Sequence, residues 1–368
     1  MKKTVFVFAF VLALIAFRQT AWAQSYINVT TEAELIAAVQ TSNAQIQFAN
    51  PISNTSLLEI KDSKTITIDL NGFALDRGCT SRGSQVIVVR NGSTLNLSNG
   101  TLTGGWGGNG GALDIETNTT VNLTDVIISG NKADDRGGGI SNKGTLTVQG
   151  GAITNNTCHD HDGPRGGGGL FNHEGATATL TDVTFNGNKA TVTGGGSICN
   201  YGTMTLDGCT ITGNSCIMNG GGIWQGPSAT LNLQGQITVT GNSSDGDVPN
   251  DLFLKNGAVI TVTGGLTGSS ISVLMESNTG TFTSGYSSHN GYDPATIFTS
   301  EFPSAMGVSL VDNEAKMDFL NSFNYIECSW DDVNKVVVKT QKTLSNQIVW
   351  TGSPYSDAGI RFSLIFVA

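Results

Sequence analysis

Acidic and basic side chains gather in two stretches of the sequence, and their types are suited to metal binding or acid–base chemistry. The stretches contain Asp134, Asp135 and Arg136, and then His159, Asp160, His161, Asp162 and Arg165. Asp oxygens suit Ca2+, and a His pair suits a transition metal. Paired carboxylates also serve as general acid and base in sugar chemistry. A solvated polar loop has the same composition, so all three interpretations stay open.

These residues define two overlapping candidate sites. The candidate metal ligands are His159, Asp160, His161 and Asp162, with Ca2+ as the possible ion. The candidate catalytic residues are Asp134, Asp135, Arg136, Asp160, Asp162 and Arg165. The sequence indicates no other cofactor.

Aromatic residues form a second candidate surface. They are Trp106, Phe171, Tyr201 and Trp224, which we expect on or near an outward column. Exposed aromatic rings can stack on sugars or contact a protein partner. The alternative is burial beneath a loop.

A repeat sets the elements that must position these residues. Five times an apolar residue stands three places before an Asn, at Ile128-Ser129-Gly130-Asn131, Ile153-Thr154-Asn155-Asn156, Phe185-Asn186-Gly187-Asn188, Ile211-Thr212-Gly213-Asn214 and Val239-Thr240-Gly241-Asn242. These Asn residues follow one another at intervals of 25, 32, 26 and 28. Such a period indicates a solenoid.

Within each repeat a glycine turn leads into alternating apolar and polar residues. In the repeat that begins at Gly138, the alternation places Ile140, Leu146 and Val148 on one face. Three short strands per turn, each with its apolar face inward, predict an all-β, right-handed parallel β-helix. The segment before the glycines varies in length from repeat to repeat. Insertions at one corner of a solenoid commonly mark its binding face, and this corner holds the charged residues.

Aligning the repeats predicts columns of like residues. Two inward aliphatic columns are Ile68, Leu97, Leu123, Val148, Leu180, Leu206, Leu233 and Val262, and Leu113, Ile140, Leu170, Ile198 and Ile223. Two Asn columns are Asn131, Asn156, Asn188, Asn214 and Asn242, and Asn142, Asn172 and Asn200 continued by Gln225. We interpret the Asn columns as hydrogen-bonded structural ladders. Cys158 and Cys216 fall two rungs apart in one inward column, about 10 Å from each other, which forbids a disulfide.

The chain divides into three expected segments. Residues 1–23 form a secretory signal, with Lys2, Lys3, an apolar run and the cleavage word Ala21-Trp22-Ala23. Residues 24–290 form the β-helix, which begins with an amphipathic capping helix near residues 30–39. Residues 291–368 form a carboxy-terminal cap or small β-rich module.

Composition excludes some classes of partner. The net charge is −10 and 13% of residues are charged, which argues against nucleic acid, because phosphate contacts need clustered Lys and Arg. No apolar run is long enough for a transmembrane helix.

The repeats resemble those of a known group of surface proteins. Two motifs alternate in the repeats, one as in Gly110-Gly111-Ala112-Leu113 and one as in Phe185-Asn186-Gly187-Asn188. This pairing of motifs resembles the repeats of polymorphic outer-membrane proteins and related bacterial β-helix adhesins. The opening that ends at Asp69-Leu70-Asn71-Gly72-Phe73 is similar to pectin-lyase-like β-helices. The resemblance covers roughly residues 30–270. Pectin-degrading hydrolases of this fold carry Gly-His-Gly and Arg-x-Lys words, and neither occurs here.

We therefore expect a secreted or cell-surface rod, adhesin-like or structural, that contacts host or microbial glycans or surface proteins. The alternative is a polysaccharide lyase or glycoside hydrolase of the pectin-lyase-like class, with its site in the cluster from Asp134 to Asp162. A lyase of this fold needs an Arg or Lys base near acidic metal ligands. Only Arg136 and Arg165 are positioned for that role.

Overall fold

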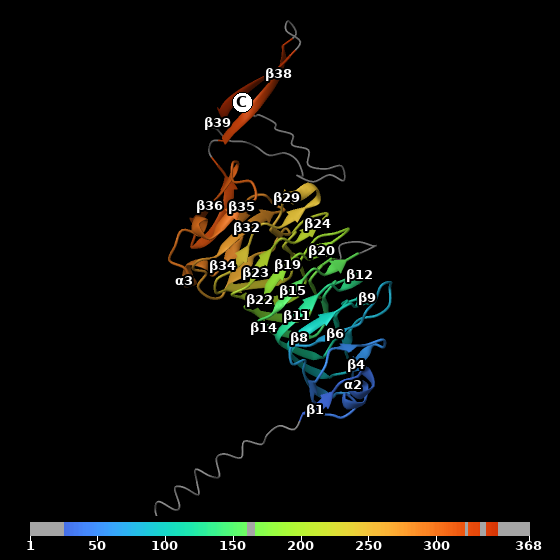
Figure 1. Ribbon diagram of the computed structural model, residues 1–368. Coiled ribbons are helices and arrows are strands. Elements are labelled where there is room, and N and C mark those ends of the chain that lie inside the picture. Colours follow the sequence, from blue (N-terminus) through green and yellow to red (C-terminus); the bar gives the residue numbers. More distant parts are fainter. Residues whose placement is uncertain (1–25, 160–165, 321–322, 332–335, 345–368) are drawn as a thin grey trace, which may run out of the picture.

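Most of the described part of the chain is a stack of parallel β-strands (Figure 1). The computed structural model describes residues 26–159, 166–320, 323–331 and 336–344. A 27-stranded sheet winds through the stack, and its pairings divide it into three flanks. The all-β parallel solenoid predicted from the repeats is confirmed. The right-handed winding of the solenoid stays a prediction.

The first flank contains the longest strands of the middle turns. Its strands are β1 (Ile27–Val29), β2 (Gln45–Phe48), β5 (Thr65–Asp69), β8 (Thr94–Thr103), β11 (Thr120–Ser129), β14 (Thr145–Gln149), β18 (Thr177–Thr181), β22 (Thr203–Asp207), β26 (Thr230–Gln234), β31 (Ile260–Val262) and β34 (Thr283–Ser284).

The second flank follows after a tight turn. It comprises β3 (Ile52–Ser53), β6 (Ala74–Asp76), the carboxy-terminal halves of β8 and β11, β15 (Ala152–Thr154), β19 (Thr184–Asn186), β23 (Thr210–Thr212), β27 (Thr238–Val239), β32 (Ser270–Met275) and β35 (Phe298–Ser300). Parallel pairing in this flank therefore extends to Ser300.

The third flank precedes the first in each turn and has outward side chains that are largely buried. It comprises β4 (Leu58–Ile60), β7 (Ile87–Val89), β10 (Leu113–Ile115), β13 (Ile140–Asn142), β17 (Leu170–Asn172), β21 (Ile198–Asn200), β25 (Ile223–Gln225), β30 (Leu252–Leu254) and the end of β32.

A fourth strand per turn forms a separate sheet at the variable corner, here called the corner sheet. It comprises β9 (Trp106–Asn109), β12 (Lys132–Arg136), β16 (Thr157–Cys158), β20 (Lys189–Ala190), β24 (Ser215–Cys216), β28 (Ser243–Ser244) and β29 (Val248–Pro249). The expectation of three strands per turn is therefore wrong for the middle of the stack. Cys158 pairs with Ala190, which pairs with Cys216, so the two cysteines are two rungs apart and form no disulfide with each other, as the columns predicted.

Few elements lie outside these flanks. They are helices α2 (Glu32–Ala38) and α3 (Tyr286–His289), the 3-10 turns η1 (Asp245–Asp247) and η2 (Pro294–Thr296), the antiparallel strands β33 (Gly280–Thr281), β36 (Met306–Val311) and β37 (Glu314–Phe319), and the hairpin β38 (Phe323–Asp331) and β39 (Val336–Leu344).

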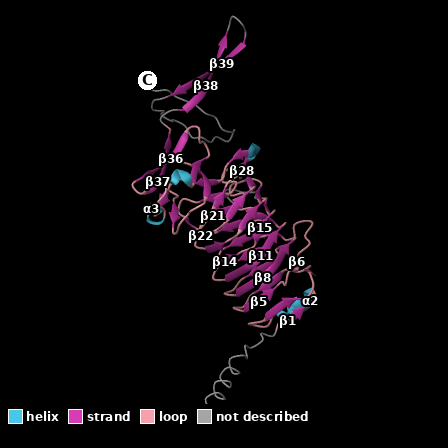
Figure 2. Cartoon of the chain, turned by 60° about the vertical axis from the view of Figure 1, so that its left-hand side comes forward, coloured by secondary structure: helices cyan, strands magenta, loops and turns pink. Residues whose placement is uncertain are grey.

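Helix α2 lies beside β1 at the amino-terminal end of the stack (Figure 2). The Thr31 side chain accepts a hydrogen bond from the Glu34 backbone N–H, and the Glu34 carboxylate accepts one from the Thr31 backbone N–H. This capping box satisfies amide groups that the helix start would otherwise leave unpaired. Leu35 and Ala38 are buried in the core. The helix expected near residues 30–39 is confirmed, and its role in capping the stack stays a prediction.

The core consists of the aliphatic columns that the repeat predicted. Val148 pairs with Leu123 on one side and Leu180 on the other, and all three side chains are at most 2% exposed. Ile140 lies in the same way between Leu113 and Leu170. Full burial of such a side chain contributes about 1.5–3 kcal/mol. Each rung therefore depends on its two neighbours.

Both Asn columns are hydrogen-bonded ladders. In the longer ladder, each side-chain amide donates to the Asn side-chain oxygen of the next rung at 2.8–3.1 Å, from Asn131 to Asn242. In the shorter ladder the same contact runs at 2.8–2.9 Å from Asn142 to Gln225. These bonds satisfy fully buried polar groups, so the structural interpretation of the Asn columns is confirmed.

The repeated glycines allow neighbouring turns to approach closely. A Cβ atom at Gly138 would lie 2.4 Å from the carbonyl oxygen of Gly168, and one at Gly168 would lie 2.3 Å from that of Gly196. No side chain fits at these separations. The glycine turns therefore allow the backbones of neighbouring turns to lie close together between the corner sheet and the third flank.

Candidate functional site

Trp106 is the centre of the first half of the charged corner. Its ring nitrogen donates to Asp134 Oδ1 at 2.8 Å, and Lys132 Nζ lies 4.6 Å from the ring centroid. The His159 ring stacks on the indole at a centroid distance of 5.7 Å. Arg82 Nε lies 2.7 Å from Asp134 Oδ2. Both oxygens of Asp134 thus have partners, and this carboxylate connects Trp106 with Arg82.

The next two residues of β12 turn toward the third flank. Arg136 Nη1 lies 3.4 Å from Asp135 Oδ2, and the Arg136 guanidinium carbon lies 5.5 Å from the Phe171 ring centroid. The corner and the aromatic residues, predicted as separate candidates, are therefore in contact through Arg136. A guanidinium over an aromatic face is a favourable cation–π arrangement.

The second half of the charged corner falls on residues that are not described. His159 is placed, whereas Asp160, His161, Asp162 and Arg165 lie outside the described residues. In the placed part of the chain, no three His, Cys, Asp or Glu side chains are grouped to hold a metal ion. The predicted Ca2+ site and the catalytic alternative both need Asp160 and Asp162, and both stay predictions.

The aromatic residues of the third flank form a continuous row. Phe171, Cys199 and Trp224 occupy successive rungs of one outward column, as expected. The Tyr201 ring stacks on Phe171 at 5.5 Å and lies tilted against Trp224 at 4.8 Å, both measured between ring centroids. We call Phe171, Tyr201 and Trp224 the aromatic row. It spans adjacent turns at one edge of the rod.

Exposure differs along this row. Phe171 is 4% exposed, because Tyr201, His173 and Arg136 pack against its ring, so the alternative of burial holds for this residue. Tyr201 and Trp224 are half-buried. Gly226 lies beside them, and a Cβ there would come within 3.3–3.4 Å of both rings. Tyr201 and Trp224 therefore both remain partly exposed.

A buried polar row beside the aromatic residues was not predicted from the sequence. Ser141 Oγ lies 3.1 Å from His173 Nε2, and Asp114 pairs with Ser141 on the preceding rung. Burial lowers the pKa of His173 to about 3, and burial raises the pKa of Asp114 against the opposing effect of Lys143. The imidazole is therefore neutral at physiological pH. The predicted outward column could have indicated that His173 lies beside the aromatic residues, because His173 stands two places after Phe171.

The row does not form a Ser-His-Asp catalytic arrangement. In a catalytic triad the carboxylate orients the imidazole, whereas Asp114 neighbours Ser141 and lies two rungs, about 10 Å, from the rung of His173. Ser141 is 0% exposed, so no substrate reaches its hydroxyl. The row contributes to packing of the third flank.

Two carboxyl groups end the longer Asn ladder. Asn242 donates its backbone and side-chain N–H groups to Asp251 Oδ1 at 2.6 and 2.7 Å, and the Asp251 backbone N–H donates to Glu301 Oε1 at 2.6 Å. Burial and the neighbouring Asp251 raise the pKa of Glu301 to about 7, and burial raises the pKa of Asp251. This pair was not predicted from the sequence, because Asp251 and Glu301 are far apart in the chain.

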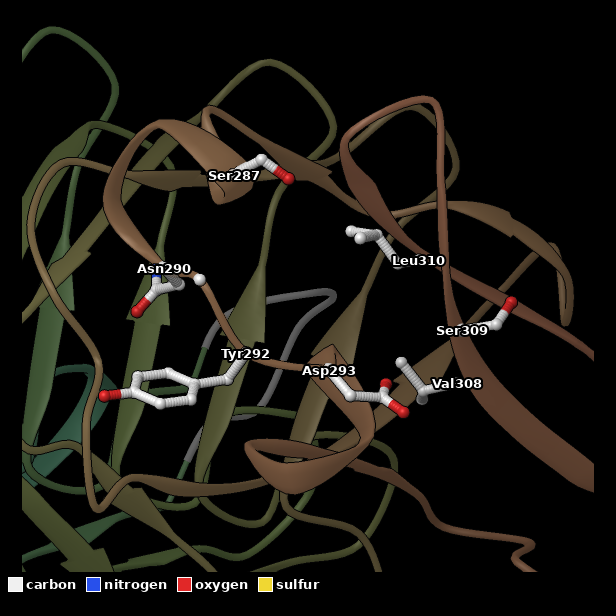
Figure 3. A pocket seen from close by; sticks show the side chains of 8 residues that line it. Ser287, Asn290, Tyr292, Asp293, Val308, Ser309 and Leu310 are labelled. Carbon is white, nitrogen blue, oxygen red and sulfur yellow. The ribbon is translucent and has the colours of Figure 1, made fainter.

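Two hollows lie on the surface of the described part of the chain. One, of about 520 Å3, lies between residues 287–293 and β36 (Figure 3). The other, of about 440 Å3, lies at the turn between the first and second flanks and is lined by polar residues, including Asp182, Asp207, Thr210 and Gln236. Neither hollow contains a residue of the charged corner or the aromatic row.

Comparison with known proteins confirms the resemblance seen in the repeats. Residues 125–143 match the repeat of the Chlamydia polymorphic membrane protein. Over 106 residues the chain is 40% identical to the probable autotransporter YfaL of Escherichia coli strain K12. That alignment covers 27% of this chain and 8% of the relative, so the chain spans a small part of that protein. No solved structure is significantly similar to the chain.

The helices that the structure describes are short. None of them is long and apolar enough to cross a membrane.

Proposed function

We propose that the protein is an adhesin-like β-helix rod displayed at the cell surface or outer membrane, where it binds glycans along one edge. The similarity to polymorphic membrane protein repeats and to a probable autotransporter supports surface display. The signal-like segment at residues 1–23 supports export. Host or microbial glycans are the expected ligands, and surface proteins are the second class of partner.

The observation that carries this proposal is the aromatic row. Tyr201 and Trp224 lie on adjacent turns, 4.8 Å apart between centroids, with their rings half-buried at the edge of the rod. Aromatic rings of this kind pack against the apolar faces of sugar rings. A row that follows the stack supports binding of an extended glycan.

The hydrolase or lyase alternative has less support from the described residues. Asp134 is held by Trp106 and Arg82, and Asp135 by Arg136. A catalytic pair would therefore have to be completed by Asp160 and Asp162. For this reason we propose binding as the function.

The test is glycan-array binding by the mature chain from Gln24, with and without Ca2+. We expect the double variant Tyr201→Ala/Trp224→Ala to lose about tenfold or more in affinity for any glycan that the parent binds, since one lost stacking contact is worth about 0.5–1.5 kcal/mol. Tyr26→Ala is the matched control, because Tyr26 is an exposed tyrosine (40%) outside the row.

The outcomes separate clearly when melting temperatures of all variants are measured alongside. Unchanged glycan affinity in a folded double variant would refute the role of the row. New reducing ends or unsaturated products in the same wells would instead establish the enzyme alternative.

A further inference from the structure

One edge of β36 has no partner strand among the described residues. The sheet order is β33-β37-β36, so β37 covers one side of β36 and leaves the other side at the end of the sheet. The hairpin between β36 and β37 turns at Asp312 and Asn313, whose φ angles are 50° and 67°. Such a two-residue turn with positive φ matches the twist of paired strands. The free edge therefore belongs to a regular hairpin.

The register shows which backbone groups face this free edge. The Leu320 N–H donates to the Ala305 carbonyl, and this pair continues the ladder in which Gly307 faces Asp318 and Ser309 faces Lys316. In an antiparallel ladder, hydrogen-bonded pairs alternate with pairs whose N–H and C=O groups point away. The main-chain groups of Val308 and Leu310 therefore point away from β37.

Residues of this edge strand line the larger hollow. Val308, Ser309 and Leu310 form one wall, and residues 290–293 form the opposite wall. Figure 3 shows the Asp293 side chain extending toward Val308 across this space, with Leu310 above it. The hollow measures about 520 Å3, within the range of ligand-binding clefts. It therefore offers room beside an unpaired strand edge.

The edge lacks the features that usually prevent strand addition. No charged residue or Pro occurs from Met306 to Val311. Leu310 is 49% exposed and Tyr292, on the opposite wall, is 57% exposed. Edge strands in proteins are normally blunted by charge, Pro or a bulge, and an apolar edge without them is a template for another strand.

The charge around the hollow is negative. Asp293 Oδ1 accepts the Ala295 backbone N–H at 3.0 Å, and the Asp293 side chain extends toward Val308 of β36 (Figure 3). Asp312 is exposed at the end of the strand. Lys316, on β37, lies 3.0 Å from Asp318. A second copy of the chain would bring a second uncharged β36 with its own Asp293 and Asp312, so like charges would oppose that pairing.

We propose that the free edge of β36 binds an extended peptide of alternating apolar and basic residues, which adds as a strand and fills the hollow. Its main chain bonds to Val308 and Leu310, its apolar side chains pack on Leu310 and Tyr292, and a basic side chain pairs with Asp293. Peptide recognition by strand addition takes its affinity from the main chain and its specificity from alternate side chains. This surface is separate from the aromatic row.

The test uses the full mature chain and two labelled octapeptides, one alternating Lys and Val and one alternating Glu and Val. We expect the Lys peptide to bind at least about tenfold more tightly by fluorescence anisotropy. Binding should protect the Val308 and Leu310 amides from hydrogen exchange. Val308→Pro, which removes an edge N–H without removing a bond to β37, should weaken binding by at least about tenfold.

Controls keep the test decisive if the proline variant fails to fold. Leu310→Lys should abolish binding, whereas Ile127→Lys, at a similarly exposed apolar residue (43%), should not change it. Tyr201→Ala/Trp224→Ala should also leave peptide binding unchanged, which separates this proposal from glycan binding. Equal binding of both peptides, or no protection of Val308 and Leu310, would overturn the proposal. A concentration-dependent dimer that Leu310→Lys abolishes would assign the edge to a second copy and also overturn it.

Discussion

The middle of the stack and its carboxy-terminal end provide hydrogen-bond partners for their buried Asn side chains in different ways. From Asn131 to Asn214, each Asn of the longer ladder donates to an identical residue on the next turn. At the end no identical turn follows, and the ladder passes to Asp251 and then Glu301. The parallel flanks likewise give way to an antiparallel sheet. The interior turns of the solenoid therefore use the same contacts again and again, whereas its last turn needs contacts that occur only there.

This difference predicts where the molecule is uniform and where it is sensitive to conditions. A neutral Asn ladder has no titratable group and should be indifferent to pH. The Asp251–Glu301 pair has raised pKa values and should respond to it. Two substitutions and one change of pH test this contrast.

The largest effect is expected from a charge placed in the aliphatic column. Val148→Asp buries a carboxylate between Leu123 and Leu180 and should destabilise the chain by more than about 4 kcal/mol, because a buried unpaired charge is costly. Thr147→Asp is the matched control, since Thr147 is the exposed neighbour on the same strand. Denaturant unfolding measures both. Equal stability of the two variants would show that the proposed register is wrong.

A smaller effect is expected when one rung of the ladder is removed. Asn188→Ala removes the acceptor of two N–H groups of Asn156 and the donor to Ile153 and Asn214, so it should cost about 3 kcal/mol. Asn186→Ala, two residues away and exposed, should cost less than about 1 kcal/mol. Thermal unfolding distinguishes the two variants. A loss as large in the Asn186 variant would contradict the ladder as the source of stability.

The smallest effect is expected from pH at the end of the ladder. The pKa of Glu301 is about 7 in the folded chain against 4.5 for the free side chain, so the folded state binds this proton more tightly. Its stabilisation is complete below about pH 4.5 and is lost as pH rises through about 7. Between pH 5 and pH 8 the chain should lose about 2 kcal/mol through this group.

Glu301→Gln removes the titrating group and should flatten the stability profile over this pH range. Glu174→Gln, at an exposed residue of the middle stack, should leave the profile as it is in the parent. Denaturant midpoints at several pH values measure the slope. The same slope in parent and Glu301→Gln would show that the pair does not control the end of the stack.

Most of the repeated interior was predictable from the sequence. The register places Leu97, Leu123 and Val148 in one column, as aligned, and the Asn columns form ladders as expected. Repetition made this possible, because in a stacked coil a residue meets the same position one turn later. The corner sheet was not predicted, because a two-residue strand such as Thr157–Cys158 is too short to show alternation.

The candidate site was predictable only in part. The outward column of Phe171, Cys199 and Trp224 was anticipated, whereas the burial of Phe171 under Tyr201 and Arg136 was not. Periodicity identifies which face a side chain takes, and it does not show what covers that face. The metal and catalytic hypotheses still rest on Asp160 and Asp162, outside the described residues.

Residue types and their spacing are enough to predict the architecture, which is a parallel β-solenoid with aliphatic columns, Asn ladders and an amino-terminal helix. These features repeat at short range or depend on local capping, so residue types and spacing suffice. The tertiary structure alone decided the contacts between parts that do not repeat. Arg82 with Asp134, Asp251 with Glu301, and β36 beside residues 290–293 are examples. Such contacts depend on where loops of unequal length return to the stack, and no period in the sequence encodes that position.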